Sequence, residues 1–395
     1  MTIILYLLFW FPIFLLLHSY FIYPILMSVL AKGNTINADT RQEEVALPQV
    51  YVLMAVYNEE IILQQKIESL LQQDYPSDRL HIYIGSDNST DFTNEILKTT
   101  HSPRITPVIF ESRQGKPSII NQLAEMVLKS SSDKESLFLM TDASVILESD
   151  VINKLSRHFK NEKIGMVDAH MTYIGMKAEG ISKSENIYLS SEVKLKSDES
   201  KVWGQMIGPF GGCFMMRAHL FRPVPANFLV DDFFISMSLL ADGYKVINDL
   251  GAVCHEPVSH DASEEYRRKK RISAGNFQNL FHYKSVLWPF HTLGFSYISH
   301  KVIRWIGPIL MILIGMSSLA LALMLGGFWN LVVIGQIVWY FIIPLIDKLI
   351  QSIGLRNAFI RNITYFNKMN VALLAGMSHY LKGIQTSIWQ PTKRE

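Results

Sequence analysis

Two sets of acidic residues stand where apolar segments end or begin, and their types suit metal and proton chemistry. Asp142 follows the apolar run 137–140, which is typical of a buried strand. Asp231 and Asp232 precede the apolar segment 233–240, which favours a helix. A carboxylate at a strand end can bind a divalent metal, and one at a helix start is stabilised by the helix terminus. An acid that binds metal and a second that accepts a proton would form a catalytic pair.

The whole chain is more apolar than a typical soluble protein. It has 395 residues, of which 49% are apolar and 18% charged, with a formal net charge of +2. This composition excludes a disordered chain, and the length accommodates one large domain with membrane segments or two ordinary domains. Cys213 and Cys254 are its two cysteines, so no disulfide framework is expected and a reducing, cytosolic location fits.

Three apolar runs are long enough to cross a bilayer, since about 20 helical residues span the hydrocarbon core. The first run, 3–30, predicts a transmembrane helix over 1–31. A cleaved signal peptide is the alternative, but it would need a basic start and a shorter apolar core. The runs 303–325 and 328–346 predict two further transmembrane helices within 303–346.

Basic residues predict how the chain is oriented in the membrane. They lie before residue 303 and after residue 346, and cytoplasmic segments carry such charges. We therefore expect the N-terminus outside and residues 31–300 in the cytoplasm, which fits the cytoplasmic membrane. The segment 347–395 is expected to be cytoplasmic or interfacial, and within it 369–386 favours an interfacial helix over a fourth span.

Between the membrane segments, strand and helix signals alternate, which predicts a layered α/β domain over 45–265. The first strand is a near-continuous apolar run, as in parallel strands buried on both faces. Neither a G-x-G-x-x-G after that strand nor a Walker-type motif is present, which argues against the corresponding phosphate sites. Strands are expected at 50–56, 81–84, 108–110 and 137–140, and helices at 60–71, 91–97 and 118–128.

Polar residues follow three of the predicted strands. Asn58 and Glu59 follow the first strand, Asp87 the second and Asp142 the fourth. In open α/β sheets, ligands bind outside the carboxyl ends of the strands. The sequence therefore predicts a binding site at that edge of the sheet.

An ordered set of short motifs resembles the membrane-bound family 2 glycosyltransferases, which have a GT-A fold with a Rossmann-like mixed sheet. Each motif alone is weak, but their order between membrane helices is specific. The matching pieces are Ala55-Val56-Tyr57-Asn58-Glu59, Ser86-Asp87-Asn88-Ser89-Thr90-Asp91, Arg113-Gln114-Gly115-Lys116, Thr141-Asp142-Ala143-Ser144, Gly211-Gly212, Asp231-Asp232 and Trp389-Gln390-Pro391-Thr392-Lys393-Arg394.

The resemblance implies a nucleotide site at the first two strands. Ala55, Tyr57, Glu59 and Asp87 match the part of the family that holds the base and the ribose. A carboxylate there can accept a hydrogen bond from the uracil N3–H or from a ribose hydroxyl. Alternatively, Asp87 and Asp91 only cap the helix that follows.

The resemblance also implies how the diphosphate is held. Lys116, near Arg113, matches a Gly-Lys close to the donor phosphates, and a solvated pair of loop cations is the alternative. Asp142 matches the metal-binding acid of a D-x-D motif, so Mg²⁺ or Mn²⁺ would bridge the phosphates and neutralise the leaving group. Ser144 replaces the second acid of that motif. One carboxylate with phosphate oxygens and waters can still hold Mg²⁺.

Asp232 matches the catalytic base of the family's Glu-Asp motif, with Asp231 where Glu is usual. An inverting transfer needs a base that takes the proton of the acceptor hydroxyl while its oxygen attacks the anomeric carbon opposite the diphosphate. The alternative is that the two acids cap a helix over 233–241, which is compatible with catalysis.

A basic segment over 266–302 is expected to be amphipathic and interfacial, since polybasic segments beside a membrane attract anionic lipid headgroups. In processive relatives a Gln-x-x-Arg-Trp motif binds the diphosphate and the acceptor. Arg268 and Arg271 stand at its positions, and Ile272 replaces the Trp. Both arginines are therefore predicted to contact the donor, and Arg271 suits a phosphate clamp. Trp389 is expected to pack at the membrane surface, and a role at the acceptor site is the alternative.

Together with the resemblance, the sequence predicts an inverting glycosyltransferase that moves a hexose or N-acetylhexosamine from a nucleotide sugar. The expected donor is a UDP-sugar. The acceptor is expected to be a lipid-linked or growing saccharide at the lipid bilayer. The alternatives are a processive polysaccharide synthase and a catalytically silent assembly subunit. No nucleic-acid partner is expected of an integral membrane protein, and a homo-oligomer is left open.

Overall fold

The computed structural model describes residues 2–37, 47–131, 133–174, 181–257, 262–287, 291–355 and 357–389. The chain divides into two compact units. The helical unit comprises Met1–Leu30, Met176–Leu195 and Asp261–Lys382, and the sheet unit comprises Ala31–Gly175, Lys196–His260 and Gly383–Glu395. The residues after the last helix therefore belong to the sheet unit.

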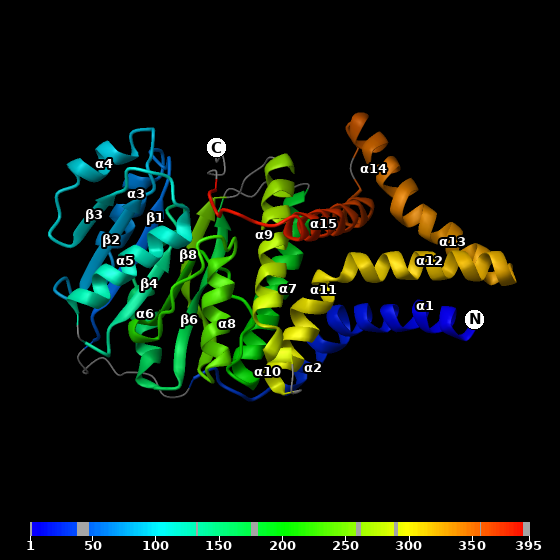
Figure 1. Cartoon of the computed structure of the whole chain (residues 1–395), viewed down its shortest axis with the longest axis horizontal. Helices are drawn as coiled ribbons and strands as arrows, with labels where there is room; N and C mark the ends of the chain where they lie inside the picture. Colours follow the sequence, from blue (N-terminus) through cyan, green and yellow to red (C-terminus); the bar gives the residue numbers. More distant parts are fainter. Residues whose placement is uncertain are drawn as a thin grey trace. The chain divides into compact units, whose positions relative to one another are not determined.

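The sheet unit is built on one mixed sheet, in which eight strands of the described residues follow the order β3-β2-β1-β4-β7-β6-β8-β5 (Figure 1). The first four strands run parallel, as the alternating sequence pattern predicts, and β7 runs antiparallel to both of its neighbours. The strands are β1 (Val50–Val56), β2 (Leu80–Ser86), β3 (Ile105–Ile109), β4 (Leu137–Thr141), β5 (Ile146–Leu147), β6 (Ile164–Ile174), β7 (Cys213–Arg217) and β8 (Lys245–Pro257).

Helices of the sheet unit follow the strands where the sequence predicts them, with boundaries shifted by a few residues. The apolar face of the first of them buries Leu63, Ile67 and Leu70 in the main core. Asp231 and Asp232 form the first turn of their helix instead of preceding it. The helices are α3 (Leu63–Leu71), α4 (Thr93–Thr99), α5 (Lys116–Ser130), α6 (Val151–Arg157), η2 (His158–Lys160), η3 (Ala218–Leu220) and α8 (Asp231–Ala241).

The pairing of β4 with β7 brings two loops together. Thr141 lies opposite Cys213, so the turn after β4 is beside the loop that precedes β7. The backbone N–H of Asp142 donates to the carbonyl of Gly212 at 3.0 Å, which continues the ladder by one hydrogen bond. A carboxylate at the end of a parallel strand is thereby placed next to a glycine pair about 70 residues away in the chain.

Among the residues that the structure describes, the helical unit contains three helices that are long and apolar enough to cross a membrane: Thr2–Leu30, Gly307–Leu325 and Phe328–Ser352. The first of them packs along the second (Figure 1). Its elements are α1 (Thr2–Leu17), η1 (His18–Ile22), α2 (Tyr23–Leu30), α9 (Ala262–His282), η4 (Lys284–Leu287), α10 (Thr292–Tyr297), η5 (Ile298–Val302), α11 (Ile303–Trp305), α12 (Gly307–Leu325), α13 (Phe328–Ile337), η6 (Val338–Ile342), α14 (Ile343–Ser352) and α15 (Ala358–Leu381), and α7 (Ile181–Val202) begins in this unit and ends in the sheet unit.

Two apolar helices differ in extent from the sequence prediction. The second span was expected from residue 303, but the helix breaks at Ile306 and α12 starts at Gly307-Pro308. Proline suits the first turn of a helix, because its missing N–H would have no partner there. The third was expected to end at residue 346, whereas α14 continues to Ser352.

The expected interfacial helix over 369–386 corresponds to the second half of α15, which is not one of the three apolar helices. This helix packs closely on α9. The Ser273 hydroxyl donates to the Leu373 carbonyl at 2.9 Å, and a Cβ at Gly376 would lie 2.7 Å from the Lys270 carbonyl oxygen. A small residue is therefore required at the crossing of these two helices. Their placement at a membrane surface stays a prediction.

Candidate active site

Asp142 is presented by a tight turn at the carboxyl end of β4. The Val145 N–H donates to the Asp142 carbonyl at 3.2 Å and closes that turn. The Asp142 side chain remains 41% exposed, although the flanking residues are buried. Backbone hydrogen bonds on both sides of Asp142 thus fix the position from which its carboxylate faces outward.

Lys116 connects Asp142 to the second acidic pair. It is the first residue of α5, after Gly115 in a left-handed conformation (φ +87°). Its ammonium lies 2.8 Å from Asp142 Oδ1 and 3.5 Å from Asp231 Oδ2. Burial alone would lower the pKa of Lys116, but the neighbouring carboxylates outweigh it and raise that pKa above its ordinary value. Lys116 is therefore a fixed cation at neutral pH.

Asp232 is the acid of the second pair whose carboxylate rests against the first turn of α8. Its Oδ1 accepts a hydrogen bond from the Phe233 N–H at 2.7 Å. Burial and the adjacent Asp231 carboxylate raise the pKa of Asp232 to about 6, against partial compensation by Lys116. A carboxylate with a pKa near 6 is ionised at pH 7 and binds a proton more readily than an ordinary aspartate does.

A glycine makes room for the Asp232 carboxylate. Gly211 has φ +84°, and a Cβ at this position would lie 2.8 Å from Asp232 Cγ. The side chain of any other residue would therefore displace Asp232. Gly211, the first residue of the glycine pair, thus lies directly against the Asp232 side chain.

The structure thus brings Asp142, Lys116, Asp231 and Asp232 into one cluster, although they come from three separate elements. Ser144 does not share in it, because its side chain is buried and its hydroxyl lies 3.4 Å from Glu256 Oε1. Within the described residues, no group of three or more His, Cys, Asp or Glu side chains could hold a metal ion alone. The exposed Asp142 carboxylate fits an ion that brings most of its ligands from a diphosphate.

Asp87 organises the loop that leads to Lys116. Its fully buried carboxylate accepts hydrogen bonds from Arg113 Nε at 3.1 Å, the Gln114 N–H at 2.7 Å and the Gly115 N–H at 3.0 Å. The structure shows these partners in place of a cap on the following helix. Asp91 lies one residue before Phe92, the N-cap of α4, and its Oδ1 accepts from the N–H of Thr93, the first residue of that helix, at 3.0 Å.

Arg113 contacts two aromatic rings. Its guanidinium carbon is 3.2 Å from the centroid of Tyr57 and 5.2 Å from that of Trp389, and Nη2 donates to the Trp389 carbonyl at 2.6 Å. Of the other residues predicted for the nucleotide, Ala55 is buried in β1 and the Glu59 N–H donates to Thr93 Oγ1 at 2.9 Å. The side chains of Tyr57, Arg113 and Trp389 thus offer planar surfaces on which a nucleobase could stack.

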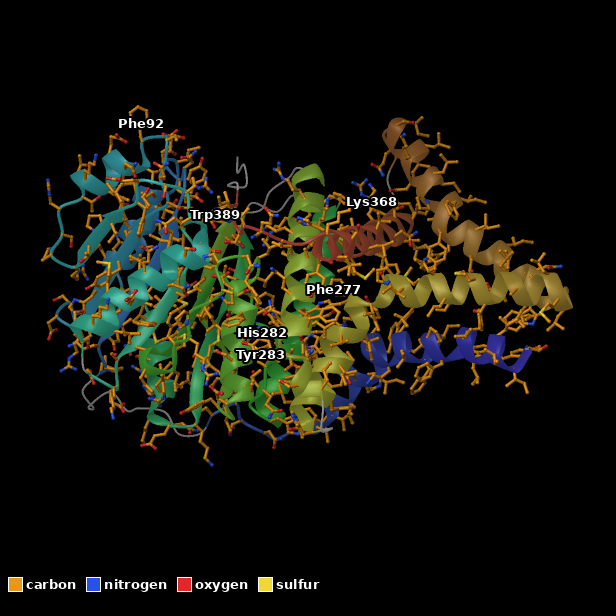
Figure 2. The ribbon with its side chains drawn as sticks, in the orientation of Figure 1. Phe92, Phe277, His282, Tyr283, Lys368 and Trp389 are labelled. Carbon is orange, nitrogen blue, oxygen red and sulfur yellow. The ribbon has the colours of Figure 1, made fainter. Side chains whose placement is uncertain are left out.

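The segment after the last helix packs against these loops, a contact that the sequence did not predict (Figure 2). Asn227 Nδ2 donates to the Ile384 carbonyl at 3.1 Å, and the Ser387 hydroxyl donates to the Ala226 carbonyl at 2.7 Å. Trp389 therefore lies at Arg113 and Tyr57, and its packing at a membrane surface stays a prediction. No local signal in the sequence specifies such long-range docking.

Asp168 lies close to the cluster that contains Asp232 and is not part of any motif in the sequence. It lies fully buried on β6, and its Oδ2 accepts from the Phe210 N–H at 2.9 Å, next to Gly211. Burial raises the pKa of Asp168 to about 7, while Lys196 and the Phe210 N–H oppose the shift. The sequence signal for Asp168 is a single acidic residue within the apolar pattern of a strand.

Arg268 and Arg271 lie on α9 of the helical unit. Arg268 Nη1 is 3.9 Å from Glu265 Oε2, one helical turn before it. The basic run is thus partly neutralised within its own helix. Contact of the two arginines with a donor phosphate stays a prediction.

Comparison with known proteins gives a consistent picture. The model of the glycosyl transferase family 2 matches residues 51–224. A β-monoglucosyldiacylglycerol synthase of Nostoc sp. is 24% identical over 163 residues, which are 40% of this chain and 34% of that protein. An N-acetylglucosaminyltransferase of Bradyrhizobium sp. is 31% identical over 129 residues, 32% of this chain and 80% of that protein. The chain thus spans about a third of the first of these relatives.

A solved structure matches almost the whole chain. The mannosyltransferase PcManGT from Pyrobaculum calidifontis, in complex with GDP-Man and Mn²⁺, superposes with a TM-score of 0.67 at 19% identity. The match covers 95% of this chain and 99% of that one. This likeness confirms the predicted GT-A type fold, a Rossmann-like mixed sheet with apolar helices at both ends.

Proposed function

Since the chain belongs to glycosyl transferase family 2, we propose that it transfers a hexose or N-acetylhexosamine from a nucleotide sugar to an acceptor hydroxyl with inversion at the anomeric carbon. The observation that carries this proposal is the cluster of Asp142, Lys116, Asp231 and Asp232. It combines a metal ligand, a cation for phosphate and a base of raised pKa at the carboxyl edge of the sheet.

Proton removal is assigned to Asp232. As the acceptor oxygen forms its bond to the anomeric carbon, its hydroxyl proton passes to the Asp232 carboxylate. The bond from the anomeric carbon to the diphosphate oxygen breaks, and its electron pair leaves with the nucleoside diphosphate. Attack from the face opposite the leaving group inverts the configuration. Gly211 leaves the carboxylate room to stand in line with the acceptor.

The leaving diphosphate is stabilised by positive charge. Asp142 would hold Mg²⁺ or Mn²⁺, which when bound neutralises the phosphates as a Lewis acid. Lys116 is placed to donate to a phosphate oxygen, and a charge-assisted hydrogen bond of this kind is stronger than a neutral one. The complex of PcManGT with GDP-Man and Mn²⁺ supports metal use in this fold.

The nucleotide is assigned to Tyr57, Arg113 and Trp389. Their rings and guanidinium offer stacking surfaces, and Asp87 fixes the loop that carries Arg113. A UDP-sugar is the expected donor, and a GDP-sugar is the alternative that the PcManGT complex suggests. Glu59 and the backbone of Ala55 lie at the same strand end and are assigned to the nucleoside.

The acceptor is assigned to the membrane surface. Three apolar helices of the chain fit a bilayer, and the named product of the Nostoc relative is a glycosylated diacylglycerol. Both observations support our assignment of the acceptor to a lipid or lipid-linked saccharide, and we place it at the cytoplasmic face of the inner membrane as part of the proposal. Arg268 and Arg271 would then lie near anionic headgroups or the donor phosphate.

The test is a donor screen with the purified full-length protein in detergent. Release of nucleoside diphosphate from UDP-sugars and GDP-sugars is measured with Mn²⁺, with Mg²⁺ and with a chelator, for the wild type and for Asp142→Asn. Metal-dependent release that the variant lacks is expected. A single added sugar supports the proposal, a product ladder indicates a processive synthase, and no turnover with any donor would indicate the silent subunit.

A further inference from the structure

A lysine lies inside the apolar core beneath the proposed metal site. Lys66 is on α3, at the same helical face as Leu63 and Leu70, and its side chain is fully buried. Lys66 is three positions after Leu63 and four positions before Leu70, which is the spacing of the apolar residues on the core-facing side of a helix. A lysine at such a position is costly unless its ammonium has polar partners.

The partners of the Lys66 ammonium are the two ends of the Asp142 turn. Its Nζ donates to Thr141 Oγ1 at 2.7 Å and to the Val145 carbonyl. These groups stand immediately before and three residues after Asp142, so a single cation ties both ends of the turn. Both acceptors are uncharged, which distinguishes this contact from an ordinary ion pair.

The same network continues to the loop that touches Asp232. The Thr141 hydroxyl donates to the Gly212 carbonyl at 3.1 Å, and this carbonyl also accepts from the Asp142 N–H at 3.0 Å. Gly212 follows Gly211, against which the Asp232 carboxylate rests. The Lys66 ammonium is therefore hydrogen-bonded to the turn that carries Asp142, and through Thr141 to the glycine loop that contacts Asp232.

Charge adds to this geometry. Burial lowers the pKa of Lys66 to about 8, while the thiols of Cys213 and Cys254 and the Asp142 carboxylate oppose the shift. The side chain is thus mainly an ammonium at pH 7, the form that donates to both acceptors.

We propose that Lys66 is a positioning residue for the metal-binding turn: its buried ammonium joins Thr141 to Val145 and so sets the direction in which Asp142 faces the donor. This inference rests on the proposed function. Residues that orient a metal ligand through hydrogen bonds, without contacting the metal, lower metal affinity by about 10- to 100-fold when they are removed.

The experiment measures Mn²⁺ binding, without turnover, by electron paramagnetic resonance of the full-length protein with UDP and separately with GDP. The variants are Lys66→Met, Thr141→Val and Asp142→Asn. Leu70→Ala is the matched control, because it weakens the same helix one turn away without touching the turn. Thermal unfolding of each variant is followed in parallel.

We expect Lys66→Met and Thr141→Val to weaken Mn²⁺ binding about 10-fold or more. Leu70→Ala should lower the melting temperature and leave Mn²⁺ binding unchanged. If Lys66→Met does not fold, Thr141→Val decides the question. The role of Lys66 is overturned if Lys66→Met binds Mn²⁺ as the wild type does while Asp142→Asn does not bind it. If Lys66→Met does not fold, the same result in Thr141→Val overturns that role. Either result leaves the proposed function intact. Unchanged binding in Asp142→Asn would instead overturn the metal assignment itself.

Discussion

Replacing Gly211 by alanine tests the placement of Asp232 most sharply. The new Cβ would lie 2.8 Å from Asp232 Cγ, whereas carbon atoms in contact stay about 3.5–4.0 Å apart. Asp232 Oδ2 would lie even closer to the new Cβ, so the carboxylate must move by at least about 0.7–1.2 Å, the difference between these carbon–carbon distances. A displacement of about 1 Å at a reacting group costs about 100-fold in rate, or about 2.7 kcal/mol of transition-state stabilisation.

Backbone strain is a second effect of this substitution and needs its own control. Gly211 has φ +84°, where a side chain costs about 1–2 kcal/mol. Gly243, in the turn after α8, has φ +86°, and a Cβ there meets no described atom within 4 Å. Gly243→Ala therefore reproduces the strain without touching Asp232.

The assay compares kcat and donor KM for both variants, with thermal unfolding as a check of the fold. We expect similar losses of stability, a kcat reduced about 100-fold in Gly211→Ala, and nearly wild-type kcat in Gly243→Ala. Donor KM should change little, because the moved group contacts the acceptor. Equal kcat values for the two variants would refute the assignment of the base.

Three further outcomes follow from the charges of the site. With a pKa of about 6, Asp232 loses its function as a base when protonated, so kcat/KM should fall below a midpoint near pH 6; a flat profile down to pH 5 would contradict this. Lys116→Met should weaken nucleoside diphosphate binding about 10- to 100-fold by calorimetry, since a charge-assisted hydrogen bond contributes about 1.5–3 kcal/mol, whereas Lys129→Met, at the exposed far end of α5, should leave it unchanged. Asp168 has a pKa of about 7 against an ordinary value of 3.8, so the folded state binds more protons in this range and loses stability as pH rises through it. Asp168→Asn should therefore reduce the drop in melting temperature between pH 5 and pH 8, and an unchanged drop would exclude Asp168 as its source.

The parts of the fold that the sequence predicts are those with a local physical signature. The apolar run of β1 and the helical spacing of α3 determine their own structure, because burial of a continuous or periodic apolar face favours one backbone state. Asp142 could be placed at the sheet edge because the carboxyl ends of parallel strands share one edge.

The remainder depends on contacts between residues that are distant in the chain. The antiparallel entry of β7 places Gly212 beside Asp142, and no local pattern specifies that neighbour. Docking of Ser387 and Trp389 near Arg113 likewise comes from tertiary packing. Lys66 could have been suspected, because a lysine interrupts a core-facing stripe.

The central claim is that Asp232 removes the acceptor proton at a site where the donor is already bound. The direct measurement is the single-turnover rate of sugar transfer, together with the donor dissociation constant, in wild type and Asp232→Asn. Asp242→Asn is the matched control, since Asp242 follows the other end of α8 and pairs with Arg222 at 2.6 Å. We predict unchanged donor binding and a rate reduced by about 100- to 10,000-fold in Asp232→Asn alone. A transfer rate within a few-fold of wild type would contradict the account.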